Sequence, residues 1–448
     1  MSAAEQSLAE LRLARQRCAR RFGEAKRNGE DLAQLKAEMQ RLGAEIEALE
    51  GELAGASDAQ SRPVPESNPA PEPERTPEPE HETRFGRPPF PPRFSASSVG
   101  PEVSGPVGVR AVTAQDRAAW EAYVEAHPQA SLYHHAAWRE LVARTMRHED
   151  VSLIAHDGTG RVVGVLPLIA MRSRLFGAFA VSLPYFNYAG PLADSAAVEQ
   201  RLLQAAGALA GQGGLSHVEV RETRARAGWP AREDKVAMIR ALPASDAALD
   251  AELGSKLRAQ VRRATREDPR WRVGGVELLD DFYRVFARNM RDLGTPVYAR
   301  GFFAAVLAAW PQRAHVVVVD LCGEPVACAL LLGYRDMLEI PWASTLREVN
   351  ALGINMFMYR RILAFAIERG YGWFDFGRST VDAGTYRFKQ QWGAVPLPNH
   401  WHYWLPPGHE LPRLNPDNPK YRLLIAVWQR LPVWVTRLIG PPVVRNIP

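Results

Sequence analysis

The sequence contains little of what builds a disulfide-stabilised, metal-binding or membrane-spanning protein. Its three cysteines, Cys18, Cys322 and Cys328, lie far apart or in apolar segments, which excludes a disulfide framework and favours a reducing compartment. His134 and His135 have no second group of ligand residues near them, so we expect no metal site. No uninterrupted apolar run reaches the roughly 18–20 residues of a membrane-spanning helix.

Charge and the first residues narrow the class of protein further. The net charge is +5 and the pI is about 9.1, a mildly basic balance that is compatible with phosphate-bearing ligands. The first residues carry no basic segment followed by an apolar core, so we expect no secretory signal peptide. We therefore predict a cytoplasmic protein, with peripheral contact at the inner membrane as an open alternative. The length of 448 residues, 46% of them hydrophobic, allows two or three domains.

Residues 1–54 have the pattern of an antiparallel coiled coil. From Leu32 to Leu53 apolar residues recur three and four positions apart, and Asn28 and Gly29 separate this pattern from a weaker one upstream. Over residues 23–31 the segment resembles the N-terminal coiled-coil arm of the seryl-tRNA synthetases, and this resemblance implies a contact with tRNA. The alternative is a plain coiled-coil dimer, because such seams are common in sequences of this composition.

Residues 55–106 are expected to form a disordered, proline-rich linker. Prolines recur there among Glu, Ser and Thr, and a second group of prolines follows at residues 88–92. Proline removes a backbone donor and favours the extended polyproline II conformation. This composition predicts a stiff spacer that tethers the coiled coil without fixing its position.

From residue 107 the pattern is that of a globular α/β protein. Two helices, a strand hairpin, a strand, a helix and a further strand follow one another at residues 115–225, and this order returns at residues 280–378. The repetition predicts two copies of one α/β unit, at residues 107–245 and 246–405, each a mixed sheet flanked by helices. Within them we expect one strand at residues 162–170 and another that ends at Phe376.

Residues 406–448 are expected to form an amphipathic extension. Between residues 421 and 440, tryptophans and aliphatic residues alternate with Arg422, Arg430 and Arg437, and Pro432 divides the segment into two short helices. The pattern fits a helix docked on the surface of a domain, and it equally fits a helix that lies in a membrane interface.

Two segments near the end of the second unit are the most informative. Residues 374–379 combine an apolar strand end with a carboxylate, a glycine, a cation and a hydroxyl, and residues 384–393 place Phe388 and Lys389 shortly before Trp392 and Gly393. Together they resemble the closing segment of the FemAB-type transferases, which are tandem acetyltransferase-like (GNAT) proteins. The FemAB-like proteins that accompany PEP-CTERM/exosortase systems and exopolysaccharide loci also share segments resembling residues 127–134, 164–168, 173–177, 188–192 and 293–296.

The resemblance implies an N-acyltransferase that forms an amide on an amine of a cell-envelope or exopolysaccharide precursor. The donor substrate would be an acyl-CoA or an aminoacyl-tRNA, with no tightly bound cofactor. The acceptor would be a nucleotide- or lipid-linked sugar precursor. The alternative is a non-catalytic partner protein of a polysaccharide or protein-sorting assembly system.

Candidate catalytic residues come from the same two segments. In peptidoglycan members of the family a Phe-Lys pair stabilises the oxyanion, so the resemblance implies this role for Lys389 and for the backbone of Phe388. Asp375 either accepts a proton from the amine or caps the loop after its strand. The candidate substrate ligands nearby are Arg378, Arg387 and Tyr386, the alternative for the arginines being solvated surface charges.

The first unit is expected to contribute an acceptor-binding loop. Tyr185, Asn187 and Tyr188, together with Arg221 after a strand, offer aromatic, amide and cationic groups that suit a glycan or a nucleotide sugar. The alternative is that these residues pack the two units together.

The donor's phosphate is expected at the start of the long helix near residue 352. In an acetyltransferase-like sheet two strands splay apart, and the helix that follows the first of them offers free backbone N–H groups. This predicts that Gly353, Asn355 and Arg347 bind the phosphate, the alternative being an ordinary loop. The usual acetyl-CoA signature (Arg/Gln-x-x-Gly-x-Gly/Ala) is absent here, which speaks against plain acetyl-CoA as donor.

Overall fold

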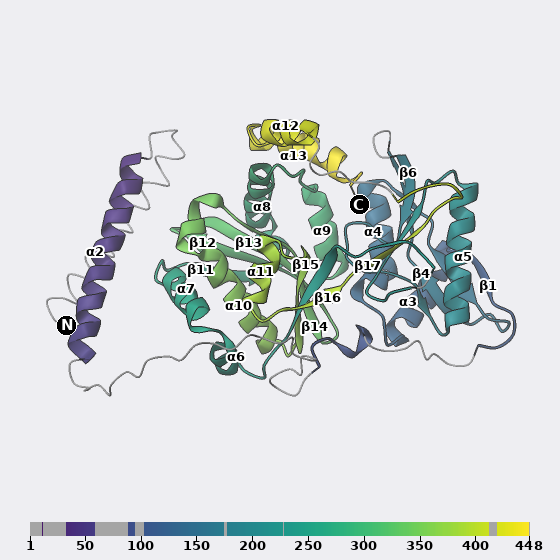
Figure 1. Cartoon of the computed structure of the whole chain (residues 1–448), viewed down its shortest axis with the longest axis horizontal. Coiled ribbons are helices and arrows are strands. Elements are labelled where there is room, and N and C mark those ends of the chain that lie inside the picture. Colours follow the sequence, from purple (N-terminus) through teal and green to yellow (C-terminus); the bar gives the residue numbers. More distant parts are fainter. Residues whose placement is uncertain are drawn as a thin grey trace, which may run out of the picture. The chain divides into compact units, whose positions relative to one another are not determined.

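The computed structural model describes residue 11 and residues 33–58, 88–94, 103–173, 177–226, 228–411 and 419–447 (Figure 1). The chain divides into two compact units, an N-terminal one and a main one. In the N-terminal unit, α2 (Ala33–Asp58) is a helix with Leu42 and Ile46 buried. A helix over the second part of the expected coiled coil is thereby confirmed. Nearly all of its expected antiparallel partner, and residues 59–87 of the expected linker, lie outside the described residues.

The first half of the main unit contains two sheets. One has the strand order β1-β3-β4-β7 and the other has the order β2-β5-β6-β8-β17-β9. Its elements are β1 (Gly108–Ala111), α3 (Arg117–Ala126), α4 (Ala136–Met146), β2 (Glu149–Asp150), β3 (Leu153–His156), β4 (Val162–Leu166), β5 (Ile169–Ser173), β6 (Gly177–Val181), β7 (Leu192–Ala193), α5 (Ala196–Gln212), β8 (Val218–Glu222) and β9 (Ala231–Arg232). The prediction of a single strand at residues 162–170 is wrong. It is divided between β4 and β5, which belong to different sheets, and Pro167 between them has no N–H for a ladder.

Helix α5 covers the core of this half. Ser195 caps its start by accepting a hydrogen bond from the backbone of Val198 at 3.3 Å. Val198 and Leu202 pack closely over Gly164 of β4, where a Cβ atom would come within 2.8 Å of the Val198 side chain. Glycine at this position therefore sets how near the helix lies to the sheet.

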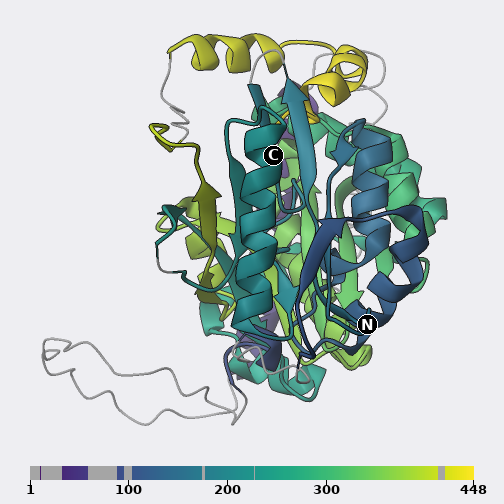
Figure 2. The same cartoon turned by 90° about the vertical axis from the view of Figure 1, so that its right-hand side faces the viewer.

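The second half is built on a seven-stranded sheet with the order β11-β12-β13-β14-β15-β10-β16. Its elements are β10 (Lys235–Ala241), α6 (Asp246–Glu252), α7 (Ser255–Thr265), β11 (Arg270–Gly274), α8 (Leu279–Leu293), α9 (Arg300–Ala309), β12 (Ala314–Leu321), β13 (Glu324–Tyr334), β14 (Met337–Thr345), α10 (Ile354–Glu368), β15 (Trp373–Thr380), α11 (Gly384–Gln390) and β16 (Val395–Pro398). The chain then continues through β17 (His400–Trp404) to α12 (Pro419–Trp428) and α13 (Val433–Val444). Figures 1 and 2 show the two helices α12 and α13 in yellow along one edge of the main unit.

The two halves exchange strands. β10 belongs by sequence to the first expected unit yet lies between β15 and β16 of the seven-stranded sheet. β17 belongs by sequence to the second expected unit yet pairs with β8 and β9 of the first half. The expected units at residues 107–245 and 246–405 therefore do not correspond to separate pieces in space. Neither half can complete its sheet without a strand from the other part of the chain.

Strand β15 differs from its expected form. It does not end at Phe376 but continues to Thr380, because β10 pairs with it along its whole length, from Trp373 to Thr380. On its other side β15 pairs in parallel with β14 over three residues only, Trp373–Asp375 of β15 against Met337–Glu339 of β14. Beyond these residues β14 and β15 share no ladder, so the sheet opens between them at this point.

Residues 88–94 depart from the expected disordered linker. They include a short 3-10 turn (Pro92–Phe94), and they pack on the main unit. The indole of Trp373 donates to the Pro88 carbonyl at 3.2 Å, and the buried Arg93 donates to Asp336 at 2.9 Å. The ring of Phe94 meets Tyr188 edge to face at 5.3 Å. The proline pattern missed this docking because the partners are more than 90 residues away in the sequence.

None of the described helices is both long and apolar enough to cross a membrane.

The docked segment predicts slow proteolysis after Arg93. Phe94→Ala removes the aromatic contact with Tyr188, which costs about 1–2 kcal/mol of docking free energy and raises the undocked fraction about five- to thirtyfold. Trypsin should therefore cleave the bond after Arg93 faster in the variant by about this factor, measured by mass spectrometry of the cut site. Val276→Ala, which shortens an exposed side chain elsewhere, should leave the rate unchanged. Equal rates in all three proteins would contradict the docking.

Candidate functional site

Two buried carboxyl groups lie where β14 and β15 separate. Glu339 and Asp375 are partners in the last pair of the parallel ladder, and their side chains are 5% and 0% exposed. Burial of one ionised carboxylate costs several kcal/mol, and two side by side repel each other as well. Adjacent buried carboxyls therefore share protons and have perturbed pKa values.

Tyrosines of the first half donate to both carboxyl groups. The Tyr133 hydroxyl donates to Glu339 at 2.6 Å, and the Tyr188 hydroxyl donates to Asp375 at 3.0 Å. Burial raises the pKa of each tyrosine well above its ordinary value, so both remain protonated donors. The site is thus assembled from both halves of the main unit.

The two carboxyl groups differ in charge. Burial raises the pKa of both, and the neighbouring Asp375 raises that of Glu339 further, well above its ordinary value. Asp375 also accepts a hydrogen bond from the backbone N–H of Gly377 at 2.7 Å and lies near the ammonium of Lys389, and both contacts favour its ionised form. We therefore assign the shared proton to Glu339 and the negative charge to Asp375.

Lys389 comes into this site from α11. Its side chain is 8% exposed, and its ammonium donates to the carbonyls of Gly377 and Arg378, both at 2.9 Å. Burial lowers the pKa of Lys389 to about 8, partly offset by Asp375. A cation with two fixed carbonyl partners still has a third N–H to direct at a ligand. Its place beside the end of the β14–β15 ladder is where developing negative charge could be stabilised.

The remaining residues of the α11 segment are placed differently. Phe388 lies within α11, where a helical N–H bonds the carbonyl four residues earlier, so its backbone is not a free donor. Its ring packs on Tyr359 at 5.0 Å and near Trp392. Tyr386 is buried, and Arg387 is exposed on the surface.

The acceptor-binding candidates gather around one indole ring. The guanidinium groups of Arg221 and Arg378 lie 4.2 and 5.3 Å from the ring of Trp401 on the exchanged strand β17. The indole N–H of Trp401 donates to the Asn187 carbonyl at 3.1 Å. Arg221 is buried and held by Glu219 at 2.6 Å. The structure thus brings together Arg221, Arg378 and Asn187.

Tyr185 and Tyr188 belong to the same loop but point to different partners. The Tyr185 hydroxyl donates to the Arg445 carbonyl at 2.6 Å, and its ring meets Tyr298 at 5.8 Å. Tyr185 has a positive φ of 77°, an uncommon conformation for a residue with a side chain. Tyr188 instead contacts Asp375, as described above. The loop therefore packs the two halves together, as the alternative prediction had it, and it also contacts the acid pair through Tyr188.

The candidate phosphate ligands lie at the start of α10. Gly353 has a φ of +73° and stands between a 3-10 turn (Arg347–Leu352) and the helix, whose first turn contains Asn355. A Cβ atom there would meet Ala264, Met356 and Gln260 at 3.8–3.9 Å, which is ordinary van der Waals contact, and the N–H of Gly353 donates to the Asn350 carbonyl at 3.1 Å. The guanidinium of Arg347 donates to the Asp292 carbonyl and is partly committed to that contact.

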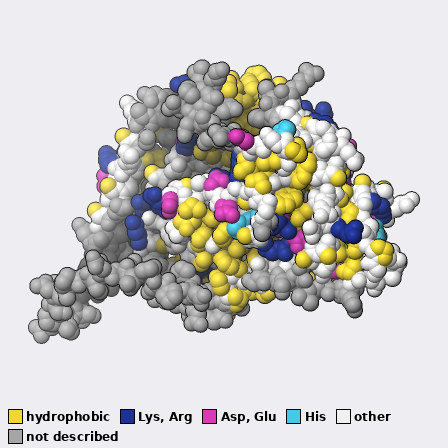
Figure 3. Space-filling view, turned by 45° about the vertical axis from the view of Figure 1, so that its right-hand side comes forward, with side chains coloured by type: hydrophobic (Ala, Val, Ile, Leu, Met, Phe, Trp, Pro, Cys, Tyr) yellow, Lys and Arg dark blue, Asp and Glu magenta, His cyan; other side chains and the backbone are white. Residues whose placement is uncertain are grey.

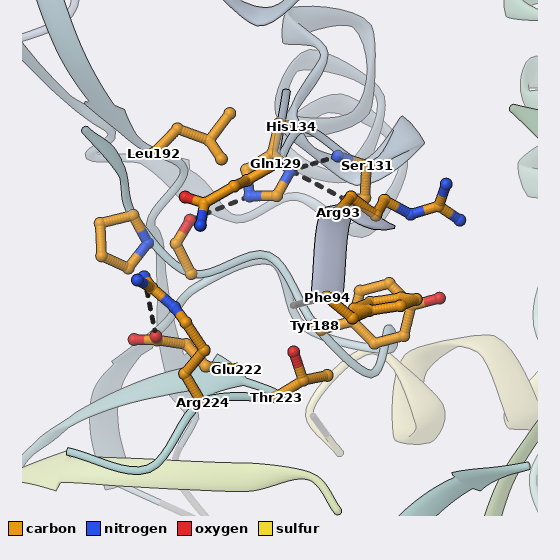
Figure 4. Close-up of a pocket in the computed structure, with 12 residues that line it drawn as sticks. Arg93, Phe94, Gln129, Ser131, His134, Tyr188, Leu192, Glu222, Thr223 and Arg224 are labelled. Atoms are coloured by element: carbon orange, nitrogen blue, oxygen red, sulfur yellow. Dashed lines mark hydrogen bonds and ion pairs between the residues drawn. The ribbon is translucent and has the colours of Figure 1, made fainter. Parts of the chain in front are cut away.

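A pocket in the first half is lined in part by Tyr188, the tyrosine that donates to Asp375 (Figure 4). It encloses about 440 Å³, including space open to solvent, and its lining residues include Arg93, Phe94, His134, Tyr188 and Arg224. Tyr188 belongs both to this wall and to the Asp375 contact. His134 is neutral, because burial lowers its pKa to about 3. The docked linker segment therefore forms part of the pocket wall.

Glu339, Tyr133 and Arg93 are not among the site residues expected from the sequence. Glu339 had a signal, since it is a single carboxylate inside the apolar strand Met337–Thr345. Tyr133 lies in one of the segments that carry the resemblance, residues 127–134, but nothing there gave it a role. Arg93 had no signal, because only its distant partners distinguish it. Among the described residues no group of three or more His, Cys, Asp and Glu could hold a metal ion.

Comparison with known proteins places this site in a domain family. Residues 254–390 match the acetyltransferase (GNAT) domain. The chain carries an acyltransferase domain of the GNAT type. The matched range contains Glu339, Asp375 and Lys389, so all three lie inside that domain. A search of curated protein sequences gives no match.

One solved structure supports the fold. The crystal structure of FemX superposes with a TM-score of 0.52 at 15% identity, covering 71% of this chain and 100% of that chain. The structure of L-PGS from Bacillus licheniformis gives a TM-score of 0.45 at 16% identity, covering 74% and 98%. With the domain match, the likeness to FemX confirms the expected α/β fold built on GNAT-like units.

The assignment of the proton to Glu339 predicts how stability depends on pH. A carboxyl whose folded-state pKa is raised contributes stability below its ordinary pKa of 4.5, and this contribution is lost as pH rises through the folded-state pKa. Wild type should therefore lose up to about 1.4 kcal/mol per pH unit relative to Glu339→Gln over this window. Urea unfolding at pH 4.5 to 8 measures the difference.

The exposed Glu368 provides the control. Glu368→Gln should show no pH-dependent difference from wild type. A constant difference between wild type and Glu339→Gln from pH 4.5 to 8 would show that Glu339 is ionised in the folded protein.

Proposed function

We propose that this protein is an N-acyltransferase of FemAB type, which forms an amide by transferring an acyl or aminoacyl group onto an amine. The observation that carries the proposal is the set of Asp375, Glu339 and Lys389 at the opening between β14 and β15, inside a matched GNAT domain. Amide formation needs a proton acceptor for the amine and a stabiliser for the oxyanion, and this set offers both.

The proposed reaction assigns one role to each group. Asp375 is held in place by hydrogen bonds from Tyr188 and from the Gly377 N–H. In its ionised form it takes a proton from the ammonium or amine of the acceptor. The amine nitrogen then attacks the donor carbonyl, and the ammonium of Lys389 stabilises the oxyanion that forms. When the intermediate collapses, the C–N bond remains and the bond from the carbonyl carbon to the donor's sulfur or ribose oxygen breaks. The leaving thiolate or alkoxide takes the proton that Asp375 accepted from the nitrogen. Protonated Glu339 keeps the site at a single negative charge.

The donor is an acyl-CoA or an aminoacyl-tRNA. Both carry phosphates, which Gly353 and Asn355 at the positive end of α10 would bind, with Arg347 adding charge. The FemAB resemblance and the coiled-coil pattern favour the aminoacyl-tRNA. The missing acetyl-CoA signature also speaks against plain acetyl-CoA.

The acceptor is an amine on a nucleotide- or lipid-linked sugar precursor of the cell envelope or of an exopolysaccharide. The support is the exposed guanidinium of Arg378, which lies 5.3 Å from the ring of Trp401, while the buried Arg221 holds that ring from the inside. Guanidinium groups bind phosphate, and an indole face binds a sugar ring. An association with PEP-CTERM/exosortase systems rests on sequence resemblance alone.

The central test replaces the lysine. Lys389→Met should lower transfer about 10²–10³-fold, the typical effect of losing one oxyanion donor. Mass spectrometry of the envelope polymer from cells lacking the protein and complemented with each variant measures the product. Lys256→Met, an exposed lysine on α7, should restore modification fully.

The same experiment separates the enzyme from a non-catalytic partner protein. Full modification by a normally folded and equally abundant Lys389→Met protein would favour the partner protein and end the catalytic assignment.

The donor site has its own test with two matched glycines. Gly353 and Gly370 both have positive φ, at the start and just beyond the end of α10. Alanine at either position should destabilise the protein by about 1–2 kcal/mol. A bound donor at a hundred times its Kd should stabilise wild type and Gly370→Ala by about 2.7 kcal/mol, seen as a raised Tm, but should not stabilise Gly353→Ala.

The test is run separately with acyl-CoA and with charged tRNA, and the donor that raises the Tm is the substrate. Stabilisation of all three proteins alike would remove Gly353 from the donor site. No effect of either donor on wild type would count against the transferase.

A further inference from the structure

The C-terminal helices α12 and α13 are held against the main unit by one side. In α13 the buried residues are Thr436, Gly440 and Val444, spaced four apart on one face. Gly440 lies so close to Val297 that a Cβ atom would come within 3.0 Å of its backbone. The helix is therefore seated on α8 and the residues after it rather than loosely attached.

The link between the two helices is also fixed. Arg291 of α8 donates to the Leu431 carbonyl at 3.0 Å, and Gln429 donates to the Asp292 carbonyl at 3.1 Å. One of the two predictions for residues 421–440 is docking on the surface of the domain, and it accounts for the inner side of the helix pair. It leaves the outer side unexplained.

The outer side is apolar. With 100° between successive residues of a helix, positions 434, 438 and 442 of α13 lie on the side opposite Thr436 and Gly440. Trp434 and Leu438 are 68% and 69% exposed. Most of the large exposed apolar side chains in the described part of the chain are on this helix pair or next to it: Leu424, Ile425, Val427, Trp434, Leu438, Ile439, Val443 and Ile447. Their concentration marks a binding surface.

Charge identifies the partner. Residues 419–447 contain no Asp or Glu, while their cations are Lys420, Arg422, Arg430, Arg437 and Arg445. Arg430 and Arg437 are exposed, and Arg437 lies 5.1 Å from the ring of Tyr283 at the edge of the apolar face. Figure 3 shows apolar side chains gathered at the upper edge, where Figures 1 and 2 place these helices.

We propose that α12 and α13 form a docking surface for an anionic lipid bilayer. An apolar face with a tryptophan, on helices whose own charged residues are all cations, is the pattern of a helix that lies in the membrane interface. The apolar side chains enter the boundary between headgroups and acyl chains, and the arginines bind lipid phosphates. The two readings of the C-terminal segment, docking on the domain and contact with a membrane, then describe opposite sides of the same helices.

The surface is connected to the candidate acceptor site. The carbonyl of Arg445, just after α13, accepts a hydrogen bond from the Tyr185 hydroxyl, and His148 contacts the same carbonyl at 2.6 Å. The Tyr185 loop continues to Asn187 and Tyr188. This step rests on the proposed function: a membrane-bound helix pair would hold the acceptor loop at the bilayer, where a lipid-linked acceptor is found.

The experiment measures binding of the full chain to sedimenting vesicles, with no donor or acceptor present. One set of vesicles is pure phosphatidylcholine, and the other contains phosphatidylglycerol in addition. Wild type should bind the anionic vesicles and be released by salt. Trp434→Ser combined with Leu438→Ser should lower the partition coefficient at least about tenfold. Arg430→Gln combined with Arg437→Gln should weaken binding to anionic vesicles only.

Val276→Ser, at another exposed apolar position, is the matched control and should bind as wild type does. Unchanged melting temperatures establish that the variants fold. Absence of binding to anionic vesicles at low salt would overturn the proposal. So would a wild-type dimer in sedimentation analysis that the Trp434 and Leu438 variant abolishes, because the surface would then join two copies. Neither result bears on whether Lys389 is needed for transfer, so the two proposals fail separately.

Discussion

The placement of Glu339 next to Asp375 within a buried ladder is the constraint on which the rest of the site depends. Two carboxyl groups in such a place are tolerated only with partners, and each has one in a tyrosine of the other half of the main unit. The proton on Glu339 and the ammonium of Lys389 offset the rest of the cost of burying the two carboxyl groups. The two tyrosines and Lys389, which offset the cost of burying the two carboxyl groups, are therefore the same groups that would position an amine and a carbonyl in the proposed reaction.

Strand exchange makes this arrangement rigid. Because β10 lies inside the second sheet and β17 inside the first, the two halves cannot separate without breaking both sheets. The tyrosines of one half consequently keep their distance from the carboxyl groups of the other. A site whose members come from different elements needs such a scaffold to hold its geometry.

Segments from both ends of the main unit meet the same region. Residues 88–94 bring Arg93 to Asp336 at the turn before β14, and residues after α13 bring the Arg445 carbonyl to Tyr185. One segment forms part of the pocket wall, and the other joins α12 and α13 to the loop of Tyr185 and Tyr188. The extensions are thus part of the site's surroundings rather than appendages.

The sequence by itself determined the order of helices and strands and the repeated α/β pattern, and it marked Asp375 and Lys389 as candidate site residues. Local periodicity encodes the elements, and charged residues beside buried aromatics stand out in any apolar segment. Only the tertiary structure decided that β15 runs on to Thr380, that strands are exchanged, that Arg93 docks and that Glu339 meets Asp375. Strand pairing and desolvation depend on residues far apart in the chain, and no local pattern records them.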